Sequence, residues 1–393
     1  MAPNKKARIL LLGKLPPPYM GPAVATKILL GSSLTERYEV LHVDTNVHES
    51  LDTIGSWSLA KVYKNAAIYS RYAAALVRAR PEVVLVPISQ STMGFLKDSV
   101  FILLAWVLGS KPLVQLRGSN LRNWLASASG PTRAYVRSAL SASSGVIVLG
   151  DNLRHLFEEY FGADRIFVVP NGADYQLPVP EPPGRAPHKG AMTVLYLANL
   201  QPSKGIEDVL EAVALLKTQG VSGFAVDVVG AWRDAATEAA CRALVGEHGL
   251  PVRFHGPAYD ADKLAFMAQA DVFVFTPREP EGHPWVIVEA LASGLPIIST
   301  DQGAIRESVR DGVNGYLVAP RNPREIAERL RLLLERPELR ATMAAASRRL
   351  YEENFTEEKM VERLSGAIDQ LIGTGTRTRR LSGRVQGAHA WTS

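Results

Sequence analysis

A proline-rich segment near the middle of the chain separates two series of alternating strand and helix patterns. Residues 178–187 contain five prolines in ten positions, which excludes both a helix and a central strand there. On either side, short apolar runs alternate with segments of helical periodicity. Such alternation predicts βαβ units and a parallel sheet covered by helices on both faces. The chain is therefore expected to fold as two doubly wound α/β domains joined by a stiff linker.

The predicted elements define the domain boundaries. Strands are predicted at residues 8–12, 39–43, 82–86, 112–116, 145–149 and 165–169 in the first series, and at 193–197, 225–229, 252–255, 271–276, 296–300 and 315–318 in the second. Predicted helices include 60–79, 132–143, 206–217, 234–247, 260–268, 285–292, 324–334, 337–351 and 357–371. The expected boundaries are a first domain at 1–177, a linker at 178–190, a second domain at 191–353, a further helix at 354–373 and a disordered basic tail at 374–393.

The composition is typical of a globular protein in a reducing, aqueous compartment. Hydrophobic residues make up 47% and charged residues 21%. The single cysteine, Cys241, excludes an intrachain disulfide and is expected to be inert packing. No Cys/His cluster has the spacing of zinc ligands, so no metal site is predicted. The longest apolar stretch, 100–109, has half the length of a bilayer span and is expected to form a buried helix.

The chain carries a mild positive charge. Its formal net charge is +5, which suits anionic ligands or a membrane surface but equally describes a solvated basic face. Basic and aromatic residues alternate over 117–137, where a membrane-facing surface and a solvated helix with packed aromatics are both open. No motif of a nucleic-acid-binding module is present. The prediction is a cytoplasmic protein, with peripheral contact on the inner face of the membrane left open and nucleic acid excluded.

Two carboxylates with seven residues between them follow a predicted strand of the second domain. Glu281 lies in a loop and Glu289 lies about five residues into the next predicted helix. Pro284 suits a first helical position, and the amides around it are of the kind that bind anions or sugar hydroxyls at a helix N-terminus. The predicted ligand-binding residues of this segment are Glu281, Gly282, His283, Pro284, Trp285 and Glu289. The alternative is a pair of ordinary solvated glutamates.

A lysine follows the first strand of the second domain. Lys204 and Gly205 lie between that strand and the next helix, where an ammonium group and a helix N-terminus could neutralise a diphosphate without a metal. The loop at 301–305 is a second candidate for phosphate binding. The alternative is a surface lysine in a turn.

Strand ends of the first domain carry further candidates. The loop 13–22 includes Gly21, which permits close backbone approach, and it lacks the G-x-G-x-x-G pattern of nicotinamide dinucleotide sites. Arg117 follows another strand and could hold a phosphate of the donor or of the acceptor. Asn120 and Arg122 are the other acceptor-side candidates. Since ligands of open α/β sheets bind beyond the carboxyl ends of the strands, these residues are expected to line a cleft.

Together these motifs resemble the family-4 retaining glycosyltransferases. The resemblance rests on the Glu281-to-Glu289 segment, on 292–296 (Ala-Ser-Gly-Leu-Pro), on Lys204-Gly205, on Pro170-Asn-Gly172 and on the Gly21 loop. It implies a GT-B fold, in which two Rossmann-like doubly wound parallel-sheet domains face a central cleft and the terminal helix returns to the first domain. It also implies that the second domain holds a nucleotide-diphosphate sugar, which is a co-substrate, and that no cofactor or metal takes part.

The resemblance assigns roles to individual residues. Glu281 meets the sugar hydroxyls, Glu289 the ribose and Lys204 the diphosphate. The sequence departs from the family at Asn199, where a second cation is usual, and at Arg117-Gly118, where His-Gly is frequent. Lys204, Glu281 and Arg117 are the predicted catalytic residues, and Asn199 is retained as a donor-side residue.

The predicted function is transfer of a sugar from a nucleotide-diphosphate sugar to a hydroxyl of a sugar or lipid-linked sugar acceptor, with retention of the anomeric configuration. The resemblance places it in cell-surface polysaccharide or glycolipid biosynthesis. Two alternatives remain: another GT-B nucleotide-sugar enzyme, such as an epimerase or hydrolase, and a non-catalytic nucleotide-sugar-binding subunit.

Overall fold

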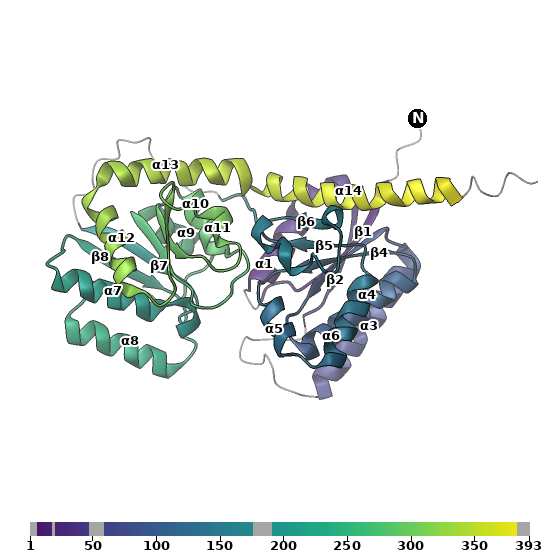
Figure 1. Ribbon diagram of the computed structural model, residues 1–393, viewed down its shortest axis with the longest axis horizontal. Coiled ribbons are helices and arrows are strands. Elements are labelled where there is room, and N and C mark those ends of the chain that lie inside the picture. The colour runs from purple at the N-terminus through teal and green to yellow at the C-terminus, as the bar shows by residue number, and fades with distance from the viewer. Residues whose placement is uncertain (1–5, 18–19, 47–58, 176–190, 383–393) are drawn as a thin grey trace, which may run out of the picture. The chain divides into compact units, whose positions relative to one another are not determined.

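The chain folds into two compact units, each built around its own six-stranded sheet (Figure 1). The computed structural model describes residues 6–17, 20–46, 59–175 and 191–382. The first unit comprises Met1–Leu149, Arg154–Val169 and Glu357–Ser393, and the second comprises Gly150–Leu153 and Pro170–Thr356. The second unit thus begins at Pro170, before the end predicted for the first domain at 177, and it also takes in the short segment after β5. The proline-rich linker predicted at 178–190 lies outside the described residues.

The first sheet is entirely parallel, with the strand order β2-β1-β3-β4-β5-β6. Its strands are β1 (Arg8–Gly13), β2 (Glu39–Asp44), β3 (Val83–Ile88), β4 (Lys111–Leu116), β5 (Gly145–Val148) and β6 (Ile166–Val168). The α-helices between them are α1 (Gly21–Gly31), α2 (Leu34–Arg37), α3 (Leu59–Ala79), α4 (Thr92–Val107), α5 (Leu121–Ser127) and α6 (Gly130–Ser141). The strands β1, β3, β4 and β5 are almost fully buried, as expected for central strands covered on both faces.

The second sheet is also parallel, with the strand order β12-β11-β10-β7-β8-β9. Its strands are β7 (Met192–Leu197), β8 (Phe224–Val229), β9 (Val252–Phe254), β10 (Val272–Phe275), β11 (Ile297–Thr300) and β12 (Gly315–Val318). Its α-helices are α7 (Ile206–Thr218), α8 (Ala235–His248), α9 (Asp260–Gln269), α10 (Trp285–Ala292), α11 (Ile305–Ser308), α12 (Pro323–Glu335) and α13 (Pro337–Asn354). The chain order reverses between β7 and β10, which makes their carboxyl ends the topological switch point of this sheet.

The last helix, α14 (Glu357–Ser382), packs on the sheet of the first unit. Met360, Leu364 and Ile368 are buried in one cluster with residues of β1, β3 and β4, and burial of each such side chain contributes about 1.5–3 kcal/mol as an upper estimate. Lys111 and Tyr38 bond the same helix, Tyr38 through Asp369 at 2.6 Å. The helix runs to Ser382, whereas a disordered tail was predicted from residue 374.

The observed elements agree closely with the sequence pattern. All twelve predicted strands are present within one or two residues of their predicted ends. Cys241 is buried in α8, and burial raises the pKa of its thiol to about 11. One expectation about burial was wrong: the apolar stretch at 100–109 forms the end of α4, but Trp106, Val107 and Leu108 are exposed. Among the described residues, no helix combines the length and apolarity needed to cross a bilayer.

Candidate functional site

The candidate site of the second unit lies at the switch point of its sheet. Lys204 follows β7 in a short 3-10 turn, Pro202–Lys204, and Glu281 follows β10. Because β7 and β10 are neighbours and parallel, the loops that leave their carboxyl ends meet. The two side chains form an ion pair between Lys204 Nζ and Glu281 Oε1. They are 23% and 15% exposed, so the pair is largely but not completely withdrawn from water. The alternatives of a surface lysine and a solvated glutamate do not describe these two residues.

Two glycines allow the loops of this site to pack closely. Gly205 has φ +79° and caps α7, and a Cβ atom there would lie 1.9 Å from the carbonyl oxygen of Thr276. Gly303 has φ +60°, and a Cβ there would lie 2.0 Å from the carbonyl oxygen of Glu281. Only glycine fits both the left-handed backbone and the close approach. The loops after β7, β10 and β11 are therefore held against one another by backbone contacts.

We predict that Gly205→Ala destabilises the protein by about 2 kcal/mol or more. An L-residue in the left-handed region costs about 1–2 kcal/mol, and the Cβ would in addition displace the backbone at Thr276. Urea unfolding measures the change. Gly246→Ala is the matched control: Gly246 lies in α8 with no neighbouring atom near an added Cβ, so alanine should stabilise by about 0.5–1 kcal/mol. Equal stability of the two variants would contradict the packing described.

Glu289 is buried in α10 with one oxygen unsatisfied. The residue is 2% exposed, and Lys263 Nζ from α9 lies 2.5 Å from its Oε1. Among the described residues, Oε2 has no hydrogen-bond partner of acceptable geometry. The Tyr175 phenol lies near this carboxylate. Burial raises the pKa of Tyr175, and the negative charge of Glu289 raises it further. Tyr175 nevertheless makes no hydrogen bond to Oε2. A buried carboxylate oxygen without a donor is costly, which makes Oε2 a candidate acceptor for ligand hydroxyls.

Arg278 ties the loop after β10 to the first turn of α7. Its guanidinium bonds both oxygens of Asp208 at 2.8 and 2.6 Å and also pairs with Glu207. These bonds raise the pKa of Arg278, Asp208 first. Its backbone N–H donates to the carbonyl of Ser203 at 2.9 Å. Arg278 therefore holds the Lys204 turn and the Glu281 loop in register rather than presenting a charge to a ligand.

His283 is a packing residue in this structure. Its Nδ1 accepts from the backbone N–H of Asn171 at 3.0 Å, so the ring proton lies on Nε2, which bonds Ser308 Oγ at 2.5 Å. Its carbonyl accepts from the side chain of Asn171 at 2.6 Å, and its ring packs on Phe355. The motif residue Asn171 thus fixes the loop that carries Glu281. The helix starts at Trp285, as predicted, and Pro284 is its N-cap rather than its first helical residue.

The predicted donor-side residues are divided between the two units. Glu281, Gly282 and the 302–304 turn are joined by a bond from the Ala304 N–H to the Gly282 carbonyl at 2.8 Å. Asn199 is an exposed residue, two positions beyond the end of β7. Gly21 lies in the other unit, as the first residue of α1. Lys263 and Arg278 were not predicted. No motif marks Lys263, whereas Arg278 could have been suspected from its position between β10 and Glu281.

The first unit has its own cavity at the carboxyl ends of β1, β3 and β4. It has a volume of about 210 Å³ and is lined, among others, by Lys14, Ser89, Asp98 and Arg117. Burial lowers the pKa of Arg117 to about 10, so the guanidinium stays charged at neutral pH. Burial also raises the pKa of Asp98, whose carboxylate accepts the Ser89 N–H at 2.7 Å. Neither Asn120 nor Arg122 lines this cavity.

The basic and aromatic residues at 117–137 do not form one surface. Trp124 is buried, and its ring lies 5.8 Å from that of Phe95. The Tyr135 hydroxyl bonds Ser99 Oγ at 2.7 Å. The solvated helix with packed aromatics therefore describes this segment better than a membrane-facing one.

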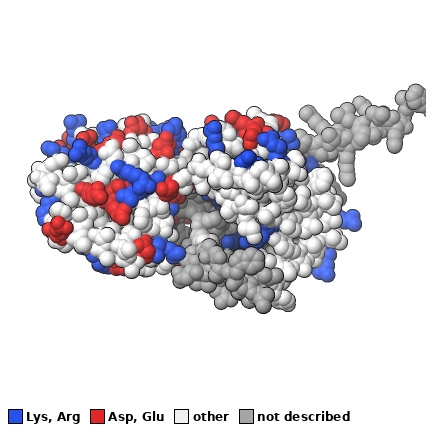
Figure 2. Space-filling model, turned by 60° about the horizontal axis from the view of Figure 1, so that its bottom comes forward, with Lys and Arg blue, Asp and Glu red and all other residues white. Residues whose placement is uncertain are grey.

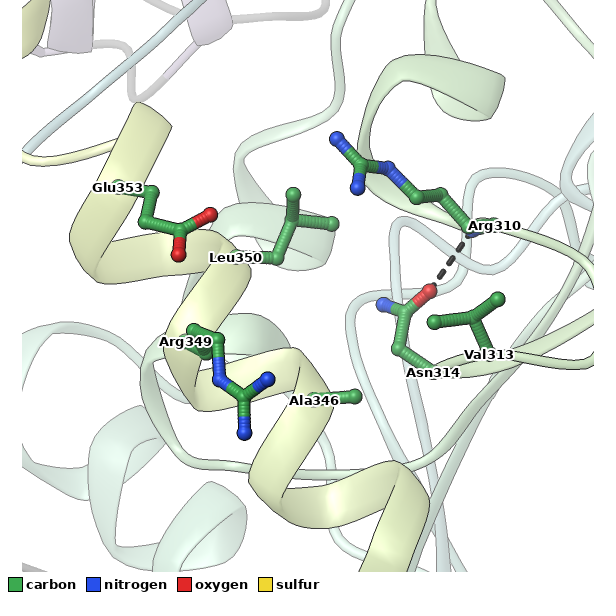
Figure 3. A pocket seen from close by; sticks show the side chains of 7 residues that line it. All are labelled: Arg310, Val313, Asn314, Ala346, Arg349, Leu350 and Glu353. Atoms are coloured by element: carbon green, nitrogen blue, oxygen red, sulfur yellow. Dashed lines mark hydrogen bonds between the residues drawn. The ribbon is translucent and has the colours of Figure 1, made fainter.

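The second unit also has a small depression that is separate from the candidate residues. It lies between α13 and the loop 310–314 and is lined by Arg310, Asn314, Arg349 and Glu353, among others (Figure 3). Its volume of about 90 Å³ is far below the 300 Å³ or so of a ligand pocket. The Asn314 side chain accepts the Arg310 N–H at 2.7 Å, which closes the loop. None of the candidate residues lines it.

Residues 182–350 match the family model of glycosyl transferases group 1. This stretch, which is less than half of the chain, is similar to the glycosyltransferase domain that the family model describes. The match covers Lys204, Glu281 and Glu289 and leaves the first unit outside. The predicted family is therefore supported at the level of group 1, while the assignment to the family-4 retaining enzymes remains a prediction.

Curated relatives and solved structures extend this result. The chain is 32% identical over 210 residues to a D-inositol 3-phosphate glycosyltransferase of Frankia alni, covering 50% of this chain and 51% of the relative. It is 31% identical over 203 residues to the phosphatidyl-myo-inositol mannosyltransferase of Mycobacterium leprae, covering 51% and 53%. The chain thus spans about half the length of the curated relatives it matches.

The fold of the whole chain has solved counterparts. A crystal structure of Anabaena Alr3699/HepE in complex with UDP and glucose is similar with a TM-score of 0.70 and 18% identity, over 92% of this chain and 99% of the other. This likeness covers both units and shows the fold alone. Together with the two parallel sheets, it confirms the predicted α/β fold of the GT-B class.

Proposed function

We propose that the protein is a glycosyltransferase that moves a sugar from a nucleotide-diphosphate sugar to an acceptor hydroxyl with retention of the anomeric configuration. The observation that carries the proposal is the convergence of Lys204 and Glu281 at the switch point of a group 1 domain. A cation and a carboxylate at this position can bind the diphosphate and the sugar of one ligand. The relatives act, by their names, on inositol phosphate and phosphatidylinositol, which supports a role in glycolipid or cell-surface polysaccharide biosynthesis.

Donor binding would exchange the partners of this ion pair. Without donor, Lys204 and Glu281 neutralise each other. A bound diphosphate supplies Lys204 with an anion and releases Glu281 to accept hydrogen bonds from sugar hydroxyls. Both charges thus keep a partner in each state, so neither is left buried and unpaired. As the sugar leaves, negative charge grows on the diphosphate, and Lys204 together with the N-terminus of α7 stabilises it.

Glu289 would hold the ribose of the donor. Lys263 forms an ion pair with the buried carboxylate and occupies Oε1. Oε2 then accepts from a ribose hydroxyl, as its lack of a partner indicates. The neighbouring α10 begins at Trp285, and its first amides face the same end of the sheet as Lys204.

The first unit would supply the acceptor side. Its cavity contains hydrogen-bonding groups on three neighbouring strand ends, including Ser89, Gln115 and Arg117. Such groups suit a sugar or lipid-linked sugar acceptor. Two routes remain open: the acceptor attacks directly from the face of the leaving group, or a covalent intermediate forms. Kinetic measurements distinguish them.

The anomeric configuration of the product, determined by NMR from its coupling constants, tests retention: an inverted product would reject it.

We also propose that transfer requires no metal. The described residues include no group of three or more His, Cys, Asp or Glu that could hold a metal ion, and Lys204 with the helix N-termini offers positive charge for the diphosphate. Transfer is expected to be unchanged after treatment with EDTA. Loss of activity that returns on adding a divalent cation would contradict this part of the proposal.

Two other functions are separated by a donor-only assay. A hydrolase or epimerase would convert the nucleotide-sugar without any acceptor, and a binding subunit would bind it without turnover. The proposed transferase should release nucleoside diphosphate much faster when an acceptor is present. Since the fold neighbour was solved with UDP, UDP-sugars are tested first, with phosphorylated and lipid-linked inositols and sugars as acceptors.

Glu281→Ala is predicted to weaken sugar recognition selectively. The variant loses the acceptor of sugar hydroxyls but frees Lys204 from its partner. Calorimetry should therefore show weaker binding of the nucleotide-sugar, by about 1.5–3 kcal/mol, with equal or tighter binding of the nucleoside diphosphate. If both ligands lost affinity equally, the division of roles between Glu281 and Lys204 would be rejected.

A further inference from the structure

The second unit contains two lysine–glutamate ion pairs near the carboxyl ends of its strands. Lys204 pairs with Glu281, and Lys263 pairs with Glu289. The two pairs are built alike: the lysine side chains are 23% and 24% exposed, and the glutamate side chains are 15% and 3% exposed. In the proposed function Lys204 binds the diphosphate, whereas Lys263 only pairs with Glu289. The likeness of the two pairs raises the question of what else Lys263 binds.

The topology brings Lys263 to the same end of the sheet as Lys204. The helix α9 begins after the carboxyl end of β9 and runs back to the start of β10. Lys263 lies at the end of its first turn, and so at the end of the sheet where ligands of doubly wound folds bind. Met267 of α9 and Ile287 of α10 share one buried cluster, which holds α9 beside the helix that carries Glu289. Lys263 is therefore part of the rim of the candidate site.

Both members of the second pair keep unused hydrogen-bonding capacity. An ammonium group has three N–H donors, and within the described part of the chain Lys263 uses one of them, on Glu289 Oε1. Glu289 Oε2 has no hydrogen-bond partner among the same residues. The carboxylate can therefore accept from a ribose hydroxyl while Lys263 stays bound to Oε1. The other N–H groups of Lys263 can then donate to an anion next to that ribose.

The diphosphate of the donor needs more positive charge than Lys204 supplies, because each of its two phosphates carries a negative charge. Asn199, two positions beyond β7, brings no charge. The guanidinium of Arg278 is held by two bonds to Asp208. On the face of the second unit that Figure 2 shows, at the left, Lys and Arg atoms lie next to Asp and Glu atoms, so these surface cations are matched by nearby acids. Among the described residues, Lys263 is the best-placed source of the second charge.

We propose that Lys263 is a second diphosphate-binding residue and that it contacts the phosphate attached to the ribose. Along a nucleotide-diphosphate sugar the order of groups is sugar, phosphate, phosphate, ribose. Glu281, predicted to hold the sugar, pairs with Lys204, and Glu289, predicted to hold the ribose, pairs with Lys263. Each lysine thus lies beside the phosphate attached to the group that its glutamate binds. This inference rests on the proposed function and adds a residue to its donor site.

Lys263 bridges Glu289 and the phosphate instead of exchanging one for the other. If it left Glu289, a carboxylate that is 2% exposed would lose its cation, which is costly. A bridging ammonium group keeps that pair and adds a charge-assisted bond to the phosphate. The bond that breaks during transfer joins the sugar to the other phosphate, where the negative charge grows. Loss of Lys263 should therefore raise KM for the donor more than it lowers kcat, which steady-state kinetics measures.

Calorimetric titration of the full chain with uridine, UMP and UDP, or with the corresponding series of the base that binds best, tests the proposal. Wild type should bind UMP about tenfold or more tighter than uridine, because the added phosphate meets Lys263. This comparison needs no variant, so it remains decisive even if a substitution impairs folding. Equal affinity of wild type for the nucleoside and its monophosphate overturns the proposal.

Variants of the two lysines assign the phosphates. Lys263→Gln should lose about tenfold or more in affinity for both UMP and UDP and much less for uridine, and Lys263→Arg should retain most of the affinity. Lys204→Ala should weaken UDP but not UMP, which lacks the phosphate next to the sugar. The exposed cation Arg233, in the loop after β8, provides the matched control: Arg233→Gln should bind all three ligands like wild type. Loss of UMP binding in Arg233→Gln but not in Lys263→Gln overturns the proposal.

The same titrations separate this inference from the function on which it rests. If no nucleoside diphosphate binds folded wild type, the proposed function fails and the role of Lys263 fails with it. If UDP binds wild type but Lys263→Gln weakens uridine, UMP and UDP by the same factor, Lys263 acts only through the position of Glu289. That result overturns the phosphate contact and leaves the proposed function in place. Thermal unfolding without ligand confirms that the variants are folded.

Discussion

Replacement of Lys204 by alanine is expected to reduce sugar transfer at least about tenfold. The ammonium group is the side-chain contact that the second unit is predicted, from the sequence, to make to the diphosphate. Loss of a charge-assisted contact costs about 1.5–3 kcal/mol, which converts to about tenfold or more in kcat/KM. The effect should fall on kcat as well as on KM, because negative charge on the diphosphate grows as the sugar departs. Steady-state kinetics with a saturating acceptor measures both.

Arg331→Ala is the matched control for this variant. Arg331 lies on α12 of the same unit, is exposed and forms an ion pair with Glu335 one turn further along that helix. Its removal should leave kcat/KM unchanged, because exposed helix pairs contribute little. Full activity of Lys204→Ala, with the control also active, would remove Lys204 from the mechanism. A loss of activity in both would point to a general effect of net charge.

Replacement of Glu289 by glutamine is expected to weaken nucleotide binding about tenfold or more. The amide keeps the volume of the side chain but removes the charge that Lys263 neutralises and converts a charge-assisted ribose contact into a neutral one. Because Glu289 is 2% exposed, the unpaired Lys263 should also lower the melting temperature. Isothermal titration with UDP, or with whichever nucleoside diphosphate binds best, gives the affinity.

A ribose comparison separates recognition from stability. Wild type should prefer a ribonucleoside diphosphate to its 2′- or 3′-deoxy analogue, and Glu289→Gln should reduce that preference. If Glu289 acted only through packing, both ligands would weaken equally and the preference would persist. Glu211→Gln, at an exposed position of α7, controls for charge removal and should bind like wild type.

The strand pattern and the loop positions of two candidate residues could be predicted from the sequence. Period and turn residues located all twelve strands and placed Lys204 and Glu281 in loops at strand ends, where ligands of doubly wound sheets bind. The ion pair between these two side chains was not predicted and comes from the structure. Gly205 was chosen for its position beside Lys204, and the structure gives the reason for a glycine: its positive φ and its contact with Thr276.

The charged residues that pair with Glu289 and Asp208 could not be predicted from the sequence. Lys263 reaches Glu289 from α9, twenty-six residues earlier in the chain, and no local pattern encodes the crossing of two helices. Arg278 pairs with Asp208 across seventy residues. The exposed face of α4 was missed for a similar reason, because an apolar run predicts burial and only the packing of α3 and α6 shows which side of the helix is left uncovered.

The most direct test of the account is calorimetric titration of wild type and Lys204→Ala with a panel of nucleoside diphosphates, UDP first. At least one nucleoside diphosphate is expected to bind wild type, and its affinity is expected to fall about tenfold or more in the variant, while Arg331→Ala binds like wild type. Tight binding that is unchanged by the loss of Lys204, or no binding of any nucleoside diphosphate to the folded wild-type protein, would contradict it.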